Sequence, residues 1–347
     1  MKLNHLTALP PDNECETIAT GFQHLDHLTG GLRIGQLCTV AARPGVGKTA
    51  FAVSLLRNIG VVQKVPTAYF SLELSELEII KRLKASITGS WEDVPKPSAE
   101  MMDVMRTIGF HYHDVDQTAM QSIEEAPVWI EDNPGVGVDD IVSRMEQLRQ
   151  ENQVRVVIID SIGLLMCDRN HIEQTQAIEK LYQAAVRLKQ AVIVTSEENS
   201  SQEVKDGCKR PRLSDLCDWG RIGSFSSMVM FVYRPECYYF EIFEDDDYSS
   251  VFEMTENGTT SLYKICDTFE DGTTAIDMAD IIVEKNCFGG TGNVRIHFDN
   301  HVSFREHSTI KKQNNNYYGT QRISGNCCQS MGIFGCKNDR TLSVERF

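Results

Sequence analysis

The chain has 347 residues, of which 41% are hydrophobic and 24% are charged, and its formal net charge at pH 7 is −15. This size allows one large α/β domain or two small ones, and no apolar run reaches the roughly 18 to 20 residues of a membrane span. The acidic balance argues against a surface coated in positive charge for duplex DNA, although a local basic groove is compatible with it. The eleven cysteines include no C-x-x-C pair, which argues against a zinc site and a disulfide framework and favours reduced thiols in a cytoplasm.

Residues 1–19 have the character of a leader, and after them short apolar segments alternate with amphipathic segments of helix length. The strand-like segments are LCTVAA, TAYFSLEL, APVWIED, VRVVIID, AVIVTS, SMVMFVYR and ADIIVEK. Short β-branched runs separated by helices are typical of a parallel sheet that is buried on both faces. The pattern therefore predicts one α/β domain over residues 20–305, with a mostly parallel, twisted sheet and helices on both faces.

Two segments depart from this alternation. Residues 236–275 are acidic with scattered aromatic side chains, and we expect them to form a surface insertion between two strands. Residues 306–347 are polar and rich in asparagine, a composition typical of a disordered tail.

The stretch CTVAARPGVGKTAF, residues 38–51, places a loop of small residues between a strand and a helix. Free N–H groups at the helix start form a concavity for an anion, and Gly45 and Gly47 let the backbone approach it closely. Lys48 can reach β and γ phosphates, and the Thr49 hydroxyl suits Mg²⁺. Ala42 replaces the first glycine of the phosphate-loop (P-loop) motif G-x-x-x-x-G-K-[ST], and an incidental glycine-rich turn is the alternative. The expected nucleotide-binding residues are Ala42, Arg43, Pro44, Gly45, Val46, Gly47, Lys48, Thr49 and Ala50.

Two acidic residues follow other strands of the predicted sheet. Asp160 ends VRVVIID, where a carboxylate can hold the water shell of Mg²⁺. Glu73 follows the strand after the P-loop helix, and a carboxylate there can polarise a water molecule in line with the γ phosphate. Because parallel strands end at the same edge of a sheet, both carboxylates are expected near Lys48.

The order of several motifs resembles the replicative DNA helicase (DnaB) family, in its RecA-like P-loop NTPase motor domain. The motifs are TGFQHLD, GGLRIGQL, AARPGVGKTAFA, FSLEL, WIEDNPGVGVDDIVSRM, VVIIDSIGLLM, KRPRLSDL, VMFVYRPECYY and GGTGNVRIHF. The resemblance implies an ATP hydrolase and 5′-to-3′ helicase that uses ATP and Mg²⁺, assembles as a hexameric ring and moves along single-stranded DNA during replication. It also implies contact with a primase or a loader.

Residue by residue, the resemblance assigns phosphate contact to Lys48, metal contact to Thr49 and Asp160, and the catalytic base to Glu73. In this family a lysine and an arginine of the neighbouring subunit complete each ATP site. Lys285 matches that lysine, and Cys287 stands where the arginine belongs. The position of the γ-phosphate sensor, a glutamine in the family, holds Glu197. The DNA-binding candidates are Arg169, Lys205, Lys209, Arg210 and Arg212, and either Arg210 or Arg234 could equally be an ordinary surface charge.

The resemblance leaves a second function open. Family members carry an amino-terminal collar and a linker helix, whereas about twenty residues precede the motor here, so we expect ring assembly to differ. With Cys287 and Glu197 in place, the alternative is an ATP-binding subunit that hydrolyses weakly and regulates or joins related helicase subunits. A RecA-like recombination or clock-type ATPase is less favoured, because the SDL and GGTGNV segments follow the helicase branch.

Overall fold

The computed structural model describes residues 16–89, 115–165, 171–198, 210–216, 221–242, 251–256, 259–266, 268–299 and 303–306. Side chains are described throughout this set except at residues 115–116, 171–172, 239–242, 251–256 and 259–265. All of these residues belong to one compact unit, residues 1–307. Apart from Glu306, the expected polar tail lies outside the described residues.

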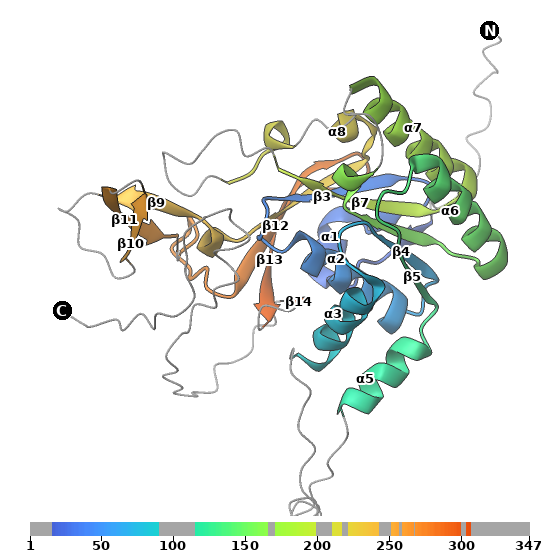
Figure 1. The fold of residues 1–347 in the computed structure, drawn as a ribbon, viewed down its shortest axis with the longest axis horizontal. Coiled ribbons are helices and arrows are strands. Elements are labelled where there is room, and N and C mark those ends of the chain that lie inside the picture. The colour runs from blue at the N-terminus through green and yellow to red at the C-terminus, as the bar shows by residue number, and fades with distance from the viewer. Residues whose placement is uncertain are drawn as a thin grey trace, which may run out of the picture. The chain divides into compact units, whose positions relative to one another are not determined.

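A nine-stranded sheet forms the centre of this unit, in the order β14-β13-β12-β8-β3-β7-β6-β4-β5 (Figure 1). Neighbouring strands from β8 to β5 pair in parallel, and β12, β13 and β14 continue the sheet in antiparallel pairing. The predicted mostly parallel α/β sheet is therefore confirmed. The strands are β3 (Leu37–Ala42), β4 (Thr67–Ser71), β5 (Val128–Asp132), β6 (Val156–Asp160), β7 (Ala191–Glu197), β8 (Met228–Tyr233), β12 (Met278–Asn286), β13 (Gly292–Asp299) and β14 (Ser303–Glu306).

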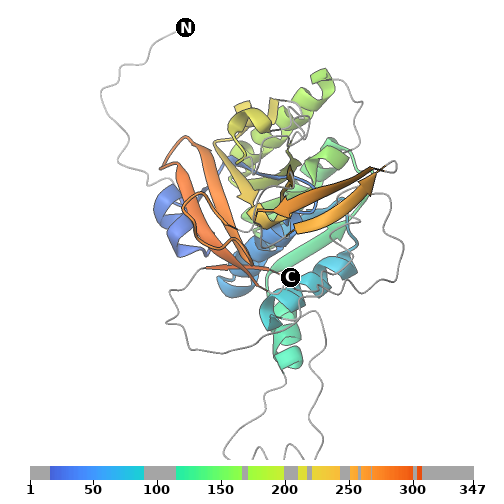
Figure 2. The same ribbon diagram turned by 90° about the vertical axis from the view of Figure 1, so that its left-hand side faces the viewer.

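Helices cover both faces of the sheet, with α2 and α3 on one side and α6 and α7 on the other (Figures 1 and 2). Because both faces are covered, every residue of β3, β6 and β8 is buried, which explains their mostly apolar sequences. The helices are α1 (Gln23–Thr29), α2 (Lys48–Leu56), α3 (Glu76–Thr88), α5 (Val115–Glu124), α6 (Val138–Asn152), α7 (His171–Leu188) and α8 (Ile222–Phe225), with a π-helix over Arg57–Val62 after α2.

Two small sheets accompany the central one. Strands β1 (Thr17–Ile18) and β2 (Leu32–Arg33) pair antiparallel within the segment before β3. Ile18 is buried in the core, so the packed structure already includes the end of the expected leader. The acidic insertion contains β9 (Tyr239–Ile242), β10 (Val251–Glu256) and β11 (Thr259–Ile265), which form an antiparallel sheet of their own.

The parallel strands give the central sheet two distinct edges. The carboxyl edge is where β3, β4, β6 and β7 end, and the amino edge is where these strands begin. A six-residue strand such as β3 separates the two edges by about 20 Å, since each residue rises about 3.3 Å. Side chains at one edge therefore cannot reach the other within one chain.

Two composition-based expectations can be compared with the structure. Cys38 and Cys287 are free thiols, but Cys266 is disulfide-bonded, so the expectation of reduced thiols is wrong for Cys266. No helix in the described part of the chain has the combined length and apolar character needed to cross a membrane.

Candidate nucleotide-binding site

The P-loop lies at the carboxyl edge, between the end of β3 at Ala42 and the start of α2 at Lys48. Gly45 has φ 79° and Gly47 has φ 115°, left-handed values that favour glycine. A Cβ atom added to Gly47 would lie 3.1 Å from Cζ of Phe304. Glycine at position 47 therefore allows both the turn of the loop and its close contact with β14.

Buried side chains from distant strands hold the P-loop in place. The Arg234 guanidinium donates a hydrogen bond to the Val46 carbonyl oxygen at 3.2 Å. Arg234 is 7% exposed, forms an ion pair with Glu236 and lies 3.9 Å over the ring of Phe298. From the sequence, Arg234 could have been an ordinary surface charge. In the structure it lies inside the protein and supports the P-loop.

The Lys48 side chain faces an acidic residue of the next strand. Ala42 at the end of β3 pairs with Glu197 at the end of β7, and the Lys48 ammonium nitrogen lies 4.0 Å from Oε1 of Glu197. Lys48 is 9% exposed, whereas the Glu197 side chain is 61% exposed. A nucleotide phosphate at the P-loop would meet a lysine that already has a weak counter-ion.

Asp160 lies one strand further along the same edge and is fully buried. Its Oδ2 accepts a hydrogen bond from the Tyr69 hydroxyl at 2.7 Å, and its Oδ1 accepts one from the Thr195 hydroxyl at 2.5 Å. Burial and the nearby charge of Asp160 raise the pKa of Tyr69 well above its ordinary value, so the phenol keeps its proton. These two hydroxyls fix the orientation of the carboxylate and leave it further lone pairs.

Glu73 follows β4 in the turn that leads to α3, and its side chain is exposed. Ser71 at the end of β4 pairs with Asp160 at the end of β6, and the Leu72 amide donates to the Asp160 carbonyl at 2.7 Å. The charge of Glu73 also contributes to the raised pKa of Tyr69. The structure therefore brings Glu73, Asp160 and Lys48 to one edge of the sheet.

Lys285 lies at the opposite, amino edge. It pairs with Val229 in β8, near the start of that strand, and its ammonium group donates to the Gly223 carbonyl at 2.9 Å. Cys287 follows β12 and is exposed. Neither residue can reach the P-loop of its own chain, so any role at an ATP site would have to be played on a neighbouring copy.

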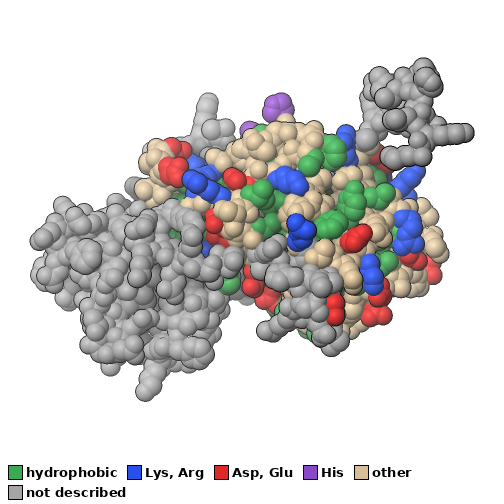
Figure 3. All heavy atoms as spheres, turned by 90° about the horizontal axis from the view of Figure 1, so that it is seen from above, with side chains coloured by type: hydrophobic (Ala, Val, Ile, Leu, Met, Phe, Trp, Pro, Cys, Tyr) green, Lys and Arg blue, Asp and Glu red, His purple; other side chains and the backbone are tan. Residues whose placement is uncertain are grey.

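The described structure does not bring the five DNA-binding candidates together at one site. Arg169, Lys205 and Lys209 lie outside the described residues. Arg210 forms an ion pair with the buried Asp280 at 3.1 Å, so a carboxylate of the same chain balances its charge. Arg212 is exposed. On the face shown in Figure 3, Lys and Arg side chains are scattered among hydrophobic and acidic ones and form no single basic patch among the described residues.

A family model described as the DnaB-like helicase C-terminal domain matches residues 17–306. The chain belongs to this family. Replicative DNA helicases DnaB from Geobacillus stearothermophilus and Treponema pallidum are each 31% identical to it, over 65% and 62% of this chain and 49% and 48% of their own lengths. The chain thus spans about half the length of these curated relatives.

Two solved structures are similar in fold. One is described as an ATPase domain, with a TM-score of 0.63 and 24% identity over 86% of this chain and 93% of that chain. The other is a DnaB-like replicative helicase studied for its interactions with primase, with a TM-score of 0.63 and 25% identity over 85% of this chain and 62% of that chain. The RecA-like fold expected from the DnaB-like motifs is therefore confirmed.

Several residues that support the site could not be found from the DnaB-like motifs. Tyr69 and Thr195 orient Asp160, and Arg234 and Phe304 hold the P-loop. Tyr69 and Thr195 each directly adjoin apolar residues of a buried strand, and such a polar group near apolar neighbours was a usable signal. Phe304 gave none, because its contact with Gly47 joins segments more than 250 residues apart in the sequence.

Proposed function

We propose that this chain is an ATP-driven motor that moves along single-stranded DNA and separates the strands of a duplex. The observation that carries the proposal is the meeting of Lys48, Asp160 and Glu73 at one edge of the sheet, within a DnaB-like motor domain. A phosphate-binding loop supported by a buried acid and followed by an exposed acid suits hydrolysis of a nucleoside triphosphate.

The donors at this edge fit a triphosphate and a magnesium ion. The left-handed Gly45 and Gly47 carry no side chain that would keep an anion from the backbone, and Lys48 supplies positive charge. The Thr49 hydroxyl and the oriented carboxylate of Asp160 are oxygen donors of the kind Mg²⁺ accepts, the latter through water. When bound, Mg²⁺ neutralises phosphate charge, while Glu73 is placed to take a proton from the attacking water.

In this proposal Glu197 does not sense the γ phosphate as an uncharged glutamine could. It acts as the counter-ion of Lys48 and competes with the triphosphate for it. Lys285 acts on the neighbouring copy, because the width of the sheet separates it from its own P-loop.

The relatives of this chain are the basis for what we propose about its oligomeric state and the nucleic acid along which it moves. Those named are replicative DNA helicases, and one solved relative is described with primase. We therefore propose a hexameric ring, movement in the 5′-to-3′ direction, a primase or loader as partner, and DNA contacts that include Arg212. The alternative, a weakly hydrolysing regulatory subunit, is not favoured by these relatives.

The experiment is a measurement of ATP turnover with and without single-stranded oligonucleotide, together with unwinding of forked duplexes. We expect stimulated turnover and unwinding only where the loading strand has a free 5′ arm. If single-stranded DNA does not change the rate of ATP turnover, and forked duplexes are not unwound whichever strand has the free arm, the motor function is contradicted and the regulatory alternative is favoured.

Solution mass, measured with and without a non-hydrolysable ATP analogue and oligonucleotide, tests the assembly. A hexamer in the presence of both ligands agrees with the proposal. A monomer under all conditions is inconsistent with a site completed by a neighbour.

A further inference from the structure

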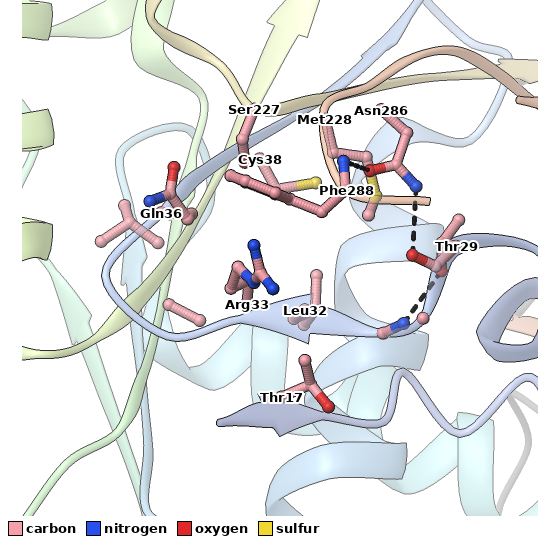
Figure 4. A pocket seen from close by; sticks show the side chains of 14 residues that line it. Thr17, Thr29, Leu32, Arg33, Gln36, Cys38, Ser227, Met228, Asn286 and Phe288 are labelled. Atoms are coloured by element: carbon pink, nitrogen blue, oxygen red, sulfur yellow. Dashed lines mark hydrogen bonds between the residues drawn. The ribbon is translucent and has the colours of Figure 1, made fainter. Parts of the chain in front are cut away.

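Arg33 belongs to the motif GGLRIGQL, to which the sequence assigned no role, and it lies at the amino edge, close to the position where the finger arginine is missing. The guanidinium carbon of Arg33 lies 3.9 Å from the centroid of the Phe288 ring, and Phe288 directly follows Cys287. Figure 4 shows the Arg33 guanidinium pointing into a cavity below that ring. The cavity has a volume of about 60 Å³, and Gln36, Cys38 and Asn286 are among its other lining residues.

The Arg33 backbone pairs with Thr17, but its guanidinium has no carboxylate partner and no hydrogen bond among the described residues, and the one contact described for it is the Phe288 ring. Most other described arginines are engaged; Arg187, for example, forms an ion pair with Glu146. A guanidinium held by an aromatic face keeps its N–H groups available, since stacking uses the flat face and not the donors. Arg33 is thus a charged group with spare hydrogen-bonding capacity.

The loop that carries Phe288 is firmly fixed. The Cys287 amide donates to the Ser227 carbonyl at 2.8 Å, and Asn286 Nδ2 donates to the Thr29 carbonyl at 3.1 Å. A Cβ atom at Gly289 would lie 2.3 Å from the Thr29 carbonyl oxygen, so only glycine permits this approach of the loop to α1. Phe288, half exposed, is therefore a rigid platform for Arg33.

Arg33 cannot serve the P-loop of its own chain. It lies just before β3, whose first residue, Leu37, accepts a hydrogen bond from Ser227 at the amino edge. The P-loop begins after the last residue of β3, about 20 Å away. A head-to-tail contact between two copies joins two different surfaces of the chain, and such a contact can bring the amino edge of one copy against the carboxyl edge of the next.

The carboxyl edge needs such a cation. When water attacks the γ phosphorus, an O–P bond forms, the bond to the β–γ bridging oxygen breaks, its electron pair leaves with ADP, and negative charge spreads over the phosphoryl oxygens. Besides Lys48, the described cations near this edge include Arg82 and Arg234, which form ion pairs with Glu78 and Glu236, and Arg43, a residue of the P-loop that lies 5.0 Å over the ring of Tyr238. Carboxylates of the same chain engage Arg82 and Arg234, so Arg43, which is also stacked on a ring, is the competing cation within the chain.

We propose that Arg33 stabilises the charge of the transition state at the ATP site of a neighbouring copy. Held against the Phe288 ring, it takes the role of the arginine that the family has where this chain has Cys287. The inference rests on the proposed ATPase function. It assigns a catalytic residue outside the segment where the family resemblance places one.

Steady-state turnover and ATP-analogue binding of Arg33→Ala and Arg33→Lys test the assignment. We expect Arg33→Ala to lower kcat by about 100-fold or more while the dissociation constant of the analogue changes less than about threefold. Arg33→Lys keeps a charge but loses the planar fork, so partial loss is expected. The matched control is Arg187→Ala, an ion-paired arginine of α7, which should retain turnover. Unchanged kcat in Arg33→Ala would overturn the proposal.

Mixed assemblies test action on a neighbour. Arg33→Ala chains keep an intact P-loop, and Lys48→Ala chains keep an intact Arg33. If Arg33 acts across the contact, mixing these two inactive variants restores turnover at the sites that combine both intact parts. Mixtures that stay as inactive as the separate variants would contradict action on a neighbour.

Two further variants separate this inference from the proposed function. Cys287→Arg in the Arg33→Ala background should restore turnover, because it places a guanidinium on the loop that carries Phe288, next to the position of the Arg33 guanidinium. Arg221, an exposed arginine directly before α8, is the alternative: loss of turnover in Arg221→Ala, with none in Arg33→Ala, would assign the role to Arg221 and overturn our proposal. If Lys48→Ala leaves turnover unchanged, the proposed ATPase function is contradicted. If Lys48→Ala loses turnover but Arg33→Ala keeps it in full, only the assignment of Arg33 is contradicted.

Discussion

The Lys48 ammonium nitrogen lies 4.0 Å from Oε1 of Glu197, across the end of two adjacent parallel strands. This pairing places a negative charge where a triphosphate would bring several more. At such a distance the interaction between two unit charges is about 1 kcal/mol in water and about 4 kcal/mol near a protein surface. The exposure of Glu197 keeps the effect toward the lower value.

We predict that Glu197→Gln binds ATP more tightly than the unchanged protein, by roughly three- to tenfold. The substitution removes the competing charge and keeps the size of the side chain. Titration with a fluorescent ATP analogue measures the dissociation constant. Equal or weaker binding by Glu197→Gln would mean that Glu197 does not oppose the phosphate.

Removing the Tyr69 hydroxyl should disturb Asp160. Because the phenol is fully buried and donates to Oδ2, Tyr69→Phe leaves a buried carboxylate oxygen without one partner, at a cost of about 1–3 kcal/mol in the free energy of unfolding. If Asp160 holds the water shell of Mg²⁺, half-maximal turnover should also require more Mg²⁺. Tyr182→Phe, at a tyrosine that packs on Phe225, is the control. If Tyr69→Phe needs the same Mg²⁺ concentration for half-maximal turnover, Asp160 does not hold the water shell of the metal.

The contact between Gly47 and Phe304 predicts a link between the last strand and nucleotide binding. Gly47→Ala places a Cβ atom 3.1 Å from the Phe304 ring at φ 115°, so the P-loop must shift. We expect ATP affinity to fall by about tenfold or more, the equivalent of about 1.4 kcal/mol. Smaller side chains at position 304 relieve the contact but not the backbone strain, so Phe304→Leu should rescue Gly47→Ala only in part. Full affinity in Gly47→Ala would refute the close packing.

Glu306 predicts a dependence of stability on pH. Burial acts to raise its pKa, but hydrogen bonds from the His24 and Gln23 amides and from the His24 ring lower it more, so the pKa lies below its ordinary value. A carboxylate with a depressed folded-state pKa contributes stability above its unfolded-state pKa, about 4.3, and this contribution is lost as pH falls through the folded-state pKa.

Glu306→Gln should therefore lower the Tm at pH 7, and the difference should shrink as the pH drops below about 4. Thermal unfolding followed by circular dichroism over this range measures it. Glu124→Gln, an exposed position in α5, is the matched control and should show no such trend. A difference in Tm that is independent of pH would contradict the assigned role of the carboxylate.

The sequence was informative wherever structure depends on neighbours along the chain. The apolar runs predicted the parallel strands, and the loop of small residues before Lys48 lies between a strand and a helix, as its sequence predicted. The two-residue strands β1 and β2 are too short to leave a pattern. The strands within the acidic insertion were missed because its composition resembles that of a surface loop.

Contacts between distant segments were beyond the reach of sequence patterns. Nothing near Arg33 indicates that its guanidinium lies under the ring of Phe288, and nothing near Arg234 indicates that it supports the Val46 carbonyl. The same holds for the Tyr69 hydroxyl on Asp160. These are the contacts that shape the two edges of the sheet, and they require the folded chain.

The most direct measurement is ATP binding and ATP turnover, in the presence of single-stranded DNA, for the unchanged chain, Lys48→Ala and Glu73→Gln. The account predicts that Lys48→Ala loses both, whereas Glu73→Gln still binds ATP but turns it over at least about 100-fold more slowly. Turnover that survives in Lys48→Ala, or that is normal in Glu73→Gln, would contradict the assignment of this edge as the site of hydrolysis.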